Sequence, residues 1–399
     1  MTVMFGVSAF GADWQPVASV RLLGGQHAFR GERVSVSGNA SVRAAIAAVL
    51  GPQWSLLGSF DSEYEGTKPL SQPVGPGTLF QQRMTHAIGL KPVFAPKKSR
   101  WRFKPSIRYR MEFLKETRDE SWNRGLFDSQ SATLGFEAEL PYRDKYELRL
   151  GFDYAFVRFP RYQSLESRSR YDFNGAVLAR ELVGDNVLNY TSQTLYSALS
   201  APLPREARLD VSLSFERKRF GSQPVVKGDG LLTGQSRIDL VTRAAGRVSL
   251  GRELRRDIRL AGGLGLSAAT TISNQNRYDA GQGVYSSRYY NQFEIGVSPR
   301  LGLELGDDRR PATLSLEPSW TRRTWGQRSV QASSGRYLSE TVHQTVWGVS
   351  LRVNYPLGTR LRFLGEIETA AASSNQGFEQ FYRYNYGSFS LLTGLGLDF

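Results

Sequence analysis

The feature that most constrains this chain is a long stretch in which apolar and charged residues alternate one by one. Between residues 100 and 113 the apolar set is Trp101, Phe103, Ile107, Tyr109, Met111 and Phe113, and the opposite set is Arg100, Arg102, Lys104, Arg108, Arg110 and Glu112. Successive side chains of a β-strand point to opposite faces. The segment therefore predicts one strand with an apolar face and a charged face, longer than a usual globular strand.

The same alternation recurs along the chain, at residues 145–156, 208–216, 237–250, 293–304 and 347–354. The connections between these segments alternate between tight and loose. Tight turns are expected at 141–144, 202–205, 253–256, 306–309 and 356–359, and looser loops at 116–130, 160–185, 220–236, 274–287, 327–337 and 374–383. Short periplasmic turns and longer extracellular loops are typical of an outer-membrane β-barrel.

The sequence thus predicts an all-β fold, a transmembrane antiparallel β-barrel of about 16 strands. The strands are expected at residues 15–24, 39–50, 53–65, 79–92, 100–116, 130–141, 145–158, 187–200, 207–219, 236–250, 257–273, 287–305, 311–325, 338–355, 360–373 and 385–399. Fourteen strands are the alternative, because the first two segments are weak and the Ala-rich stretch 42–50 also fits a helix. An even number places both termini in the periplasm.

Composition agrees with a barrel and excludes other membrane folds. The mean hydropathy is −0.37, and no run of 18 or more apolar residues is present, so a helical membrane protein is excluded. A barrel strand needs apolar residues only at every second position, which a hydropathy average hides. One barrel would occupy residues 13–399 as a single domain. Residues 1–12, apolar and ending in small residues before Asp13, are expected to be the remnant of a signal peptide.

The net charge of +14 raises the question of nucleic acid, which the distribution of basic residues answers. Basic and aromatic residues occupy opposite faces of the same strands, whereas a nucleic-acid surface needs them together. We therefore expect no nucleic-acid partner. The chain contains no Cys, which excludes disulfides and thiolate chemistry.

The C-terminus carries the most specific motif. Apolar residues alternate to the last position, and Gly394, Leu397 and Phe399 resemble the terminal signal that the barrel-assembly machinery reads on the last strand. Leu392 departs from that signal, which usually has a polar residue there. The resemblance implies a location in the bacterial outer membrane, with outer-membrane lipid and the assembly machinery as partners. Periplasmic or other envelope proteins are further candidate partners.

The charged faces would line the lumen, with a mixed wall and a basic excess. The expected carriers of selectivity are Arg102, Arg108 and Arg110, with Arg149, Arg243 and Arg247 as a second group. Rings of basic side chains favour anions, so the lumen predicts a channel for anionic small solutes or an anionic polymer. Alternatively, arginines and carboxylates on neighbouring strands simply pair across the wall. The plan resembles polysaccharide-export barrels and general porins, and the loop 160–185 is a candidate for an inward-folded constriction.

The sequence leaves two alternative functions. The first is a plugged barrel that serves as a structural anchor or docking partner in an envelope machine, in which case the charged loop 115–128 could cover the mouth or bind a partner. The second is an outer-membrane hydrolase. His27, His86 and His343 are the only histidines and lie far apart in sequence, and no zinc, phosphate-binding or serine-nucleophile motif is present. We therefore expect no enzyme, no catalytic residue, no cofactor and no metal.

Overall fold

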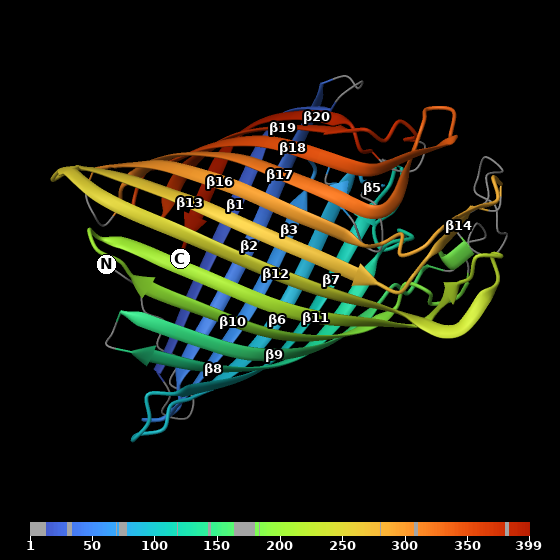
Figure 1. The fold of residues 1–399 in the computed structure, drawn as a ribbon. Helices are drawn as coiled ribbons and strands as arrows, with labels where there is room; N and C mark the ends of the chain where they lie inside the picture. Colours follow the sequence, from blue (N-terminus) through green and yellow to red (C-terminus); the bar gives the residue numbers. More distant parts are fainter. Residues whose placement is uncertain are drawn as a thin grey trace.

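The computed structural model is a closed antiparallel β-barrel of 16 strands (Figure 1). Strands that follow one another in the chain pair side by side around the wall, and β20 pairs with β1 to close it. The structure describes residues 13–29, 34–68, 70–71, 78–117, 119–142, 145–162, 180–182, 184–279, 281–306, 310–379 and 383–399.

The strands of the wall match the predicted segments closely. They are β1 (Asp13–Phe29), β2 (Ser35–Val49), β3 (Trp54–Glu65), β6 (Gln82–Phe94), β7 (Arg102–Lys115), β8 (Ser129–Tyr142), β9 (Tyr146–Arg158), β10 (Tyr190–Pro202), β11 (Ala207–Val226), β12 (Leu232–Arg255), β13 (Ile258–Ser273), β16 (Gln292–Leu305), β17 (Ala312–Gln331), β18 (Tyr337–Pro356), β19 (Leu361–Ser374) and β20 (Tyr386–Asp398). The predicted all-β barrel is confirmed. The 14-strand alternative and the helical reading of 42–50 are wrong, since this stretch lies almost wholly in β2 and pairs on both sides.

The extracellular end departs from the prediction. The expected loops 220–236 and 327–337 are largely strand, because the hairpins β11–β12 and β17–β18 extend past the rest of the wall. Both hairpins carry register irregularities there. The loop 274–287 contains a small hairpin of β14 (Arg277–Asp279) and β15 (Val284–Ser286), and a short pair of β4 (Leu70–Ser71) and β5 (Thr78–Leu79) follows β3.

Strand β1 begins and strand β20 ends at the end of the barrel that carries the short turns (Figure 1). Phe399 and Ala18 exchange two backbone hydrogen bonds, which anchor the last residue against β1. The described connections at this end are mostly shorter than those at the opposite end, so the predicted asymmetry of tight and loose connections is present. Residues 1–12, expected to be a signal remnant, and most of the expected constriction loop 160–185 lie outside the described residues.

One ion pair identifies the inner face of the wall. Arg247 on β12 lies 3.9 Å from Glu317 on β17, although β13 and β16 lie between these strands. Side chains that far apart around a curved wall can meet only on its concave side, so the charged face is inside. The opposite face carries the exposed apolar side chains, for example Phe152, Leu213 and Leu301. This arrangement suits a barrel that crosses a bilayer, because the apolar outer face can contact lipid and the charged inner face can contact water.

Closure between β20 and β1 requires glycine on the inner face. A Cβ built on Gly394 would lie 1.8 Å from the carbonyl oxygen of Leu22, and one built on Gly25 would lie 2.0 Å from that of Leu391. Such contacts with backbone atoms cannot be relieved by turning a side chain. The two strands therefore approach one another more closely at these positions than a residue with a Cβ would permit.

We predict that Gly394→Ala impairs closure and lowers the yield of folded barrel several-fold, because the methyl group overlaps backbone of β1. The measurement is the heat-dependent mobility shift of the barrel on gels, together with its melting temperature. Gly246→Ala on β12 is the matched control, since a Cβ there meets nothing within 4 Å. Equal stability of the two variants would show that the seam does not need glycine.

Candidate functional site: the barrel lumen

The inner wall carries basic and acidic side chains in nearly equal numbers. Those described are Arg21, Arg43, Arg83, Lys91, Arg102, Lys104, Arg108, Arg110, Arg149, Arg208, Lys218, Arg237, Arg243, Arg247, Arg259, Arg300, Arg323, Arg352 and Arg362, against Asp61, Glu63, Glu65, Glu112, Glu137, Glu139, Glu147, Asp153, Asp210, Glu216, Asp239, Glu253, Glu294, Glu304, Glu317, Glu366, Glu368 and Asp398. Counting charges alone therefore gives little basic excess inside. The arrangement of these charges decides what a solute meets.

Five of the six predicted selectivity residues have a carboxylate partner. The ion pairs are Arg102–Glu139 at 3.0 Å, Arg110–Glu112 at 3.7 Å, Arg149–Glu147 at 3.0 Å, Arg243–Glu216 at 3.0 Å and Arg247–Glu317 at 3.9 Å. Arg108 forms no ion pair with any residue that the structure describes. The paired wall that the sequence left as an alternative is thus present around these residues.

The two partners of a pair are not equally exposed. The exposed fractions of the basic and acidic side chains are 51% and 8% for Arg102–Glu139, 51% and 13% for Arg243–Glu216, and 49% and 17% for Arg352–Glu366. Arginine is longer than glutamate, so its guanidinium reaches into the lumen while the carboxylate stays against the wall. The order is reversed in Arg323–Glu294 and Arg362–Asp398 and, by a small margin, in the buried pair Arg237–Asp239. In most pairs, however, water in the lumen meets the guanidinium first.

Two of the predicted arginines, Arg149 and Arg247, line one luminal pocket of about 430 Å³. Its floor is made of small and hydroxyl-bearing residues, among them Ser212, Ser267 and Ser298. Apart from Arg247 and Asp210, the luminal side chains of β10 to β16 at this pocket are small and extend only a short way into the lumen. On β7 and β8 the luminal side chains are long and charged. Asp210 also lines the pocket and accepts hydrogen bonds from Ser200 and Arg208. The pocket therefore combines free volume, two guanidinium groups and hydroxyl donors with one paired carboxylate, which suits a small anion.

The densest charge cluster lies on β7 and β8. Glu139 accepts hydrogen bonds from Arg102 and from Lys104, and Lys104 also lies 3.3 Å from Glu137. Tyr196 on β10 donates to Glu137 at 3.2 Å. The ring of Tyr196 lies over Gly151, where an added Cβ would come within 2.1 Å of it. Glycine at this luminal position accommodates the tyrosine and does not leave open space.

The extracellular rim contains a packed layer that the sequence did not indicate. Arg237 on β12 is 3% exposed and makes a bidentate ion pair with Asp239, with its guanidinium 4.4 Å from the Phe220 ring centre and 4.0 Å from that of Tyr290. Tyr290 comes from the 274–291 loop, so this arginine joins the loop to the wall. Because buried charges require partners, the contact fixes the loop over this side of the mouth.

A second buried cluster lies between the β17–β18 hairpin and the loop before β20. Trp325, Val330, Val342 and Tyr384 form its core, and Arg328 stacks on Trp325 at 4.7 Å. The sequence alternation could not show these contacts, since they join the extended ends of two strands to a residue of a distant loop. Both clusters lie at the extracellular end of the barrel, between β11 and β20.

The loop 116–128 is folded back on its own strands. Asp128 is buried and accepts hydrogen bonds from the backbone of Leu114 and Gly125. Phe127 packs against Phe80 and Trp122 lies over Lys115. The aromatic residues of this loop therefore pack on the rim. Whether the loop binds a partner stays a prediction.

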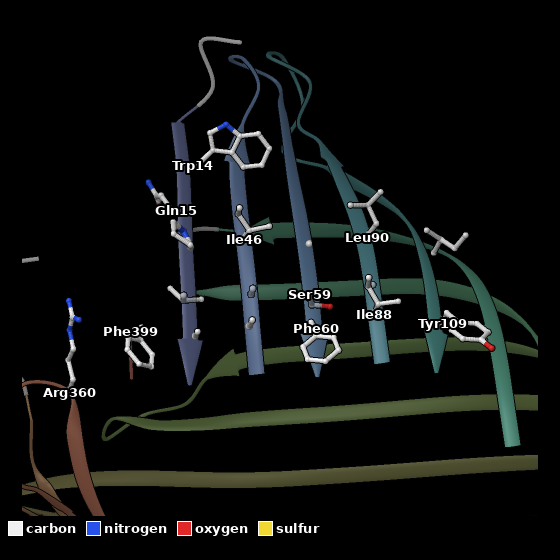
Figure 2. Close-up of a pocket in the computed structure, with 18 residues that line it drawn as sticks. Trp14, Gln15, Ile46, Ser59, Phe60, Ile88, Leu90, Tyr109, Arg360 and Phe399 are labelled. Carbon is white, nitrogen blue, oxygen red and sulfur yellow. The ribbon is translucent and has the colours of Figure 1, made fainter. Parts of the chain in front are cut away.

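A larger pocket, of about 1090 Å³, lies on the outer face of β1 to β7. Figure 2 shows Ile46, Phe60 and Ile88 projecting from neighbouring strands around it. Along each strand these residues alternate with the luminal charges, so they point outward. Small residues such as Ala44 and Gly58 make this outer surface concave. An apolar hollow on the lipid side is filled by membrane lipid, so it is no solute site.

The three histidines do not converge. His86 and His343 have the outward parity of their strands, and His86 bonds with Ser62 at 3.0 Å. His27 faces inward on β1 and is buried, with no hydrogen-bond partner on its ring among the described residues. No group of three His, Asp or Glu with the geometry for a metal ion is found in the described part of the chain.

The closed barrel, with its apolar exterior, wet charged interior and short turns on the side of the termini, fixes where the chain resides. It is a bacterial outer-membrane protein. No protein family and no curated protein matches the sequence. No helix among the described residues has the length and hydrophobicity to cross a membrane.

Solved structures resemble the barrel at low sequence identity. OmpT, an outer membrane protein of Vibrio cholerae in a trimer form, is 11% identical over 97% of this chain and 99% of that one, with a TM-score of 0.47. Pseudomonas aeruginosa OccD3 (OpdP) is 7% identical over 96% and 91%, with a TM-score of 0.48. A bacterial polysaccharide outer membrane secretin is 9% identical over 96% and 97%, with a TM-score of 0.43. The closed strand order itself establishes the fold.

We predict that Glu139→Gln shifts the ion selectivity toward anions, because Arg102 and Lys104 both lose their shared carboxylate. The zero-current potential in a salt gradient across a planar bilayer measures the shift. Asp229→Asn is the control, since this residue is exposed at the tip of the β11–β12 hairpin, beyond the wall. An unchanged potential, or a shift toward cations, would contradict the role given to Glu139.

Glu181 predicts a pH dependence of the extracellular rim. It is 1% exposed in the 3-10 helix η1 (Arg180–Leu182), where Tyr290 donates to Oε1 at 2.9 Å, and burial raises its pKa although Arg277 and Arg237 oppose the rise. A raised pKa in the packed state means that packing is favoured at low pH and loses this contribution as the pH rises through that pKa. Protection of residues 184–190 from hydrogen exchange should therefore fall with rising pH, after correction for intrinsic rates.

The variant Glu181→Gln keeps the shape of the side chain and removes its titration. Its protection should be nearly independent of pH between about 4 and 8. The same pH dependence in this variant as in the native protein would show that another group titrates.

Proposed function

We propose that the protein is an outer-membrane channel for hydrophilic solutes that prefers small anions. The observation that carries the proposal is the unequal exposure within the luminal ion pairs, in which the guanidinium faces the water and the carboxylate lies against the wall. A wall whose charges nearly balance in number can therefore still present a positive surface. The half-exposed side chains of Arg149, Arg243 and Arg247 support a lumen that holds water.

The pocket that Arg149 and Arg247 share supports a stopping point for an anion along the path. A carboxylate or phosphate there could accept hydrogen bonds from both guanidinium groups. The Glu147 and Glu317 partners limit the affinity, because each holds part of its arginine's charge. Weak binding suits conduction, since a solute must leave as readily as it enters. The proposal involves no catalytic residue and no cofactor.

Single-channel recording of the purified protein in a planar bilayer tests this function. We expect a steady open conductance with an anion preference, and a smaller preference in the Arg149→Gln/Arg247→Gln double variant and in Arg108→Gln. The matched control is Arg252→Gln/Arg256→Gln, which removes two exposed charges at the short-turn end. A correctly folded barrel that stays silent would overturn the channel and favour the docking role. A cation preference would overturn only the selectivity.

A further inference from the structure

The outer face of the barrel carries arginines at one level, immediately beyond the apolar band. On β9, β11 and β17 an outward aromatic residue is followed two positions later by an outward arginine. The pairs are Phe156 and Arg158, Phe215 and Arg217, and Trp320 and Arg322. All three strands run toward the extracellular end, so each arginine lies on the extracellular side of its aromatic residue. Arg219 adds a fourth, two residues beyond Arg217.

These arginines are outside the lumen by register. Glu216 and Lys218 point inward, since Glu216 pairs with Arg243 on the luminal face, so Arg217 and Arg219 point outward. Arg322 has the parity opposite to that of Arg323, which pairs with luminal Glu294. All four side chains are exposed, and none forms an ion pair with a residue that the structure describes. Luminal arginines, in contrast, are mostly paired.

The level of these residues follows from the length of the apolar band. On β11 the outward residues Leu209, Val211, Leu213 and Phe215 precede Arg217. Ala207 has the same outward parity, and the nine residues from Ala207 to Phe215 extend roughly 26 Å along the strand. At a tilt of about 40° they cross roughly 20 Å of membrane, close to the roughly 25 Å apolar band of an outer-membrane barrel. Aromatic residues mark the interface with the headgroups, so the arginines that follow them lie among the headgroups of the outer leaflet.

Arg217 and Arg219 lie in a shallow hollow whose other polar residues are uncharged. A hollow of about 430 Å³ on the outer face is lined by these two arginines together with Ser236, Ile238 and Asn274. The neighbouring outward positions on β10 are Thr191 and Gln193, which are polar and uncharged. No acidic side chain occupies the outward positions of β9 to β12 at this level. Unpaired arginines beside an apolar band suit an anionic headgroup on an acyl anchor.

We propose that the outward arginines of β9 and β11, chiefly Arg217 and Arg219, bind a phosphorylated glycolipid of the outer leaflet through its phosphate groups. Guanidinium groups donate two parallel hydrogen bonds to a phosphate, which a lysine cannot do. Two arginines two residues apart on one face lie roughly 7 Å from each other, so they can hold one phosphate between them. Acyl chains of the same lipid would lie on the apolar band below.

Binding of bis-phosphorylated lipid A to the detergent-solubilised full-length barrel, measured by native mass spectrometry, tests the proposal. We expect Arg217→Gln/Arg219→Gln to weaken binding by roughly tenfold or more, and Arg252→Gln/Arg256→Gln, with the same loss of charge at the opposite end, to leave it within about twofold. Heat-dependent gel mobility verifies that each variant is folded.

Two further arms separate a lipid site from a general anion site. Dephosphorylated lipid A should bind much more weakly than the bis-phosphorylated form, and millimolar inorganic phosphate should not displace the lipid. Unchanged binding in the Arg217→Gln/Arg219→Gln variant, an equal loss in the control variant, or displacement by inorganic phosphate would each overturn the proposal. None of these outcomes depends on whether the barrel conducts ions.

Discussion

The closure of the sheet is the constraint on which the rest of this structure depends. Backbone N–H and C=O groups inside a bilayer find no water, so a sheet that crosses it must leave no unpaired edge. Here the edge is removed by pairing β20 with β1. Gly25 and Gly394 allow this pairing, because any side chain there would overlap the backbone of the neighbouring strand. Once the sheet is closed, alternation divides every strand into a lipid face and a water face.

The inner face then has to solvate many charges in a confined volume. Pairing across neighbouring strands does this, and it is set by register: Arg102 lies opposite Glu139, and Lys104 lies opposite Glu137. The difference in length between arginine and glutamate gives these pairs a direction, with the positive end toward the lumen. The selectivity we propose is thus a property of side-chain geometry more than of the number of charges. On the outer face, arginines such as Arg217 and Arg219 lie at the level of the headgroups and form no ion pair with a residue that the structure describes.

Much of the wall could be predicted from sequence, because alternation is a local signal. The strand from Arg102 to Lys115 was predicted to within two residues, since charged and apolar residues alternate along almost its whole length. The extensions of β11 to Val226 and of β17 to Gln331 were missed, because strands beyond the bilayer need no apolar face and their register there is irregular. The stacking of Arg237 on Tyr290 joins a residue of β12 to a residue of a separate loop, which no periodicity reveals.

The candidate site was predicted only in part for the same reason. The parity of Arg149 and Arg247 followed from their strands, whereas their convergence on one pocket depends on the small residues of β10 and β11 between them, such as Ala198 and Ser212. Likewise, the inward parity of Gly151 does not tell whether its side of the wall is open, and the ring of Tyr196 from the next strand fills it. A sequence gives the face of each residue, but the partner across the wall depends on register.

The most direct test of the account is to locate anions in the lumen itself. Crystals of the protein soaked in bromide would show anomalous peaks at each bound anion, and soaking in rubidium would show bound cations. The account predicts bromide beside Arg149 and Arg247 in their shared pocket, with few rubidium ions on the luminal surface. Rubidium along the lumen and bromide only on the exterior would contradict it, because the carboxylates would then be the groups that face the water.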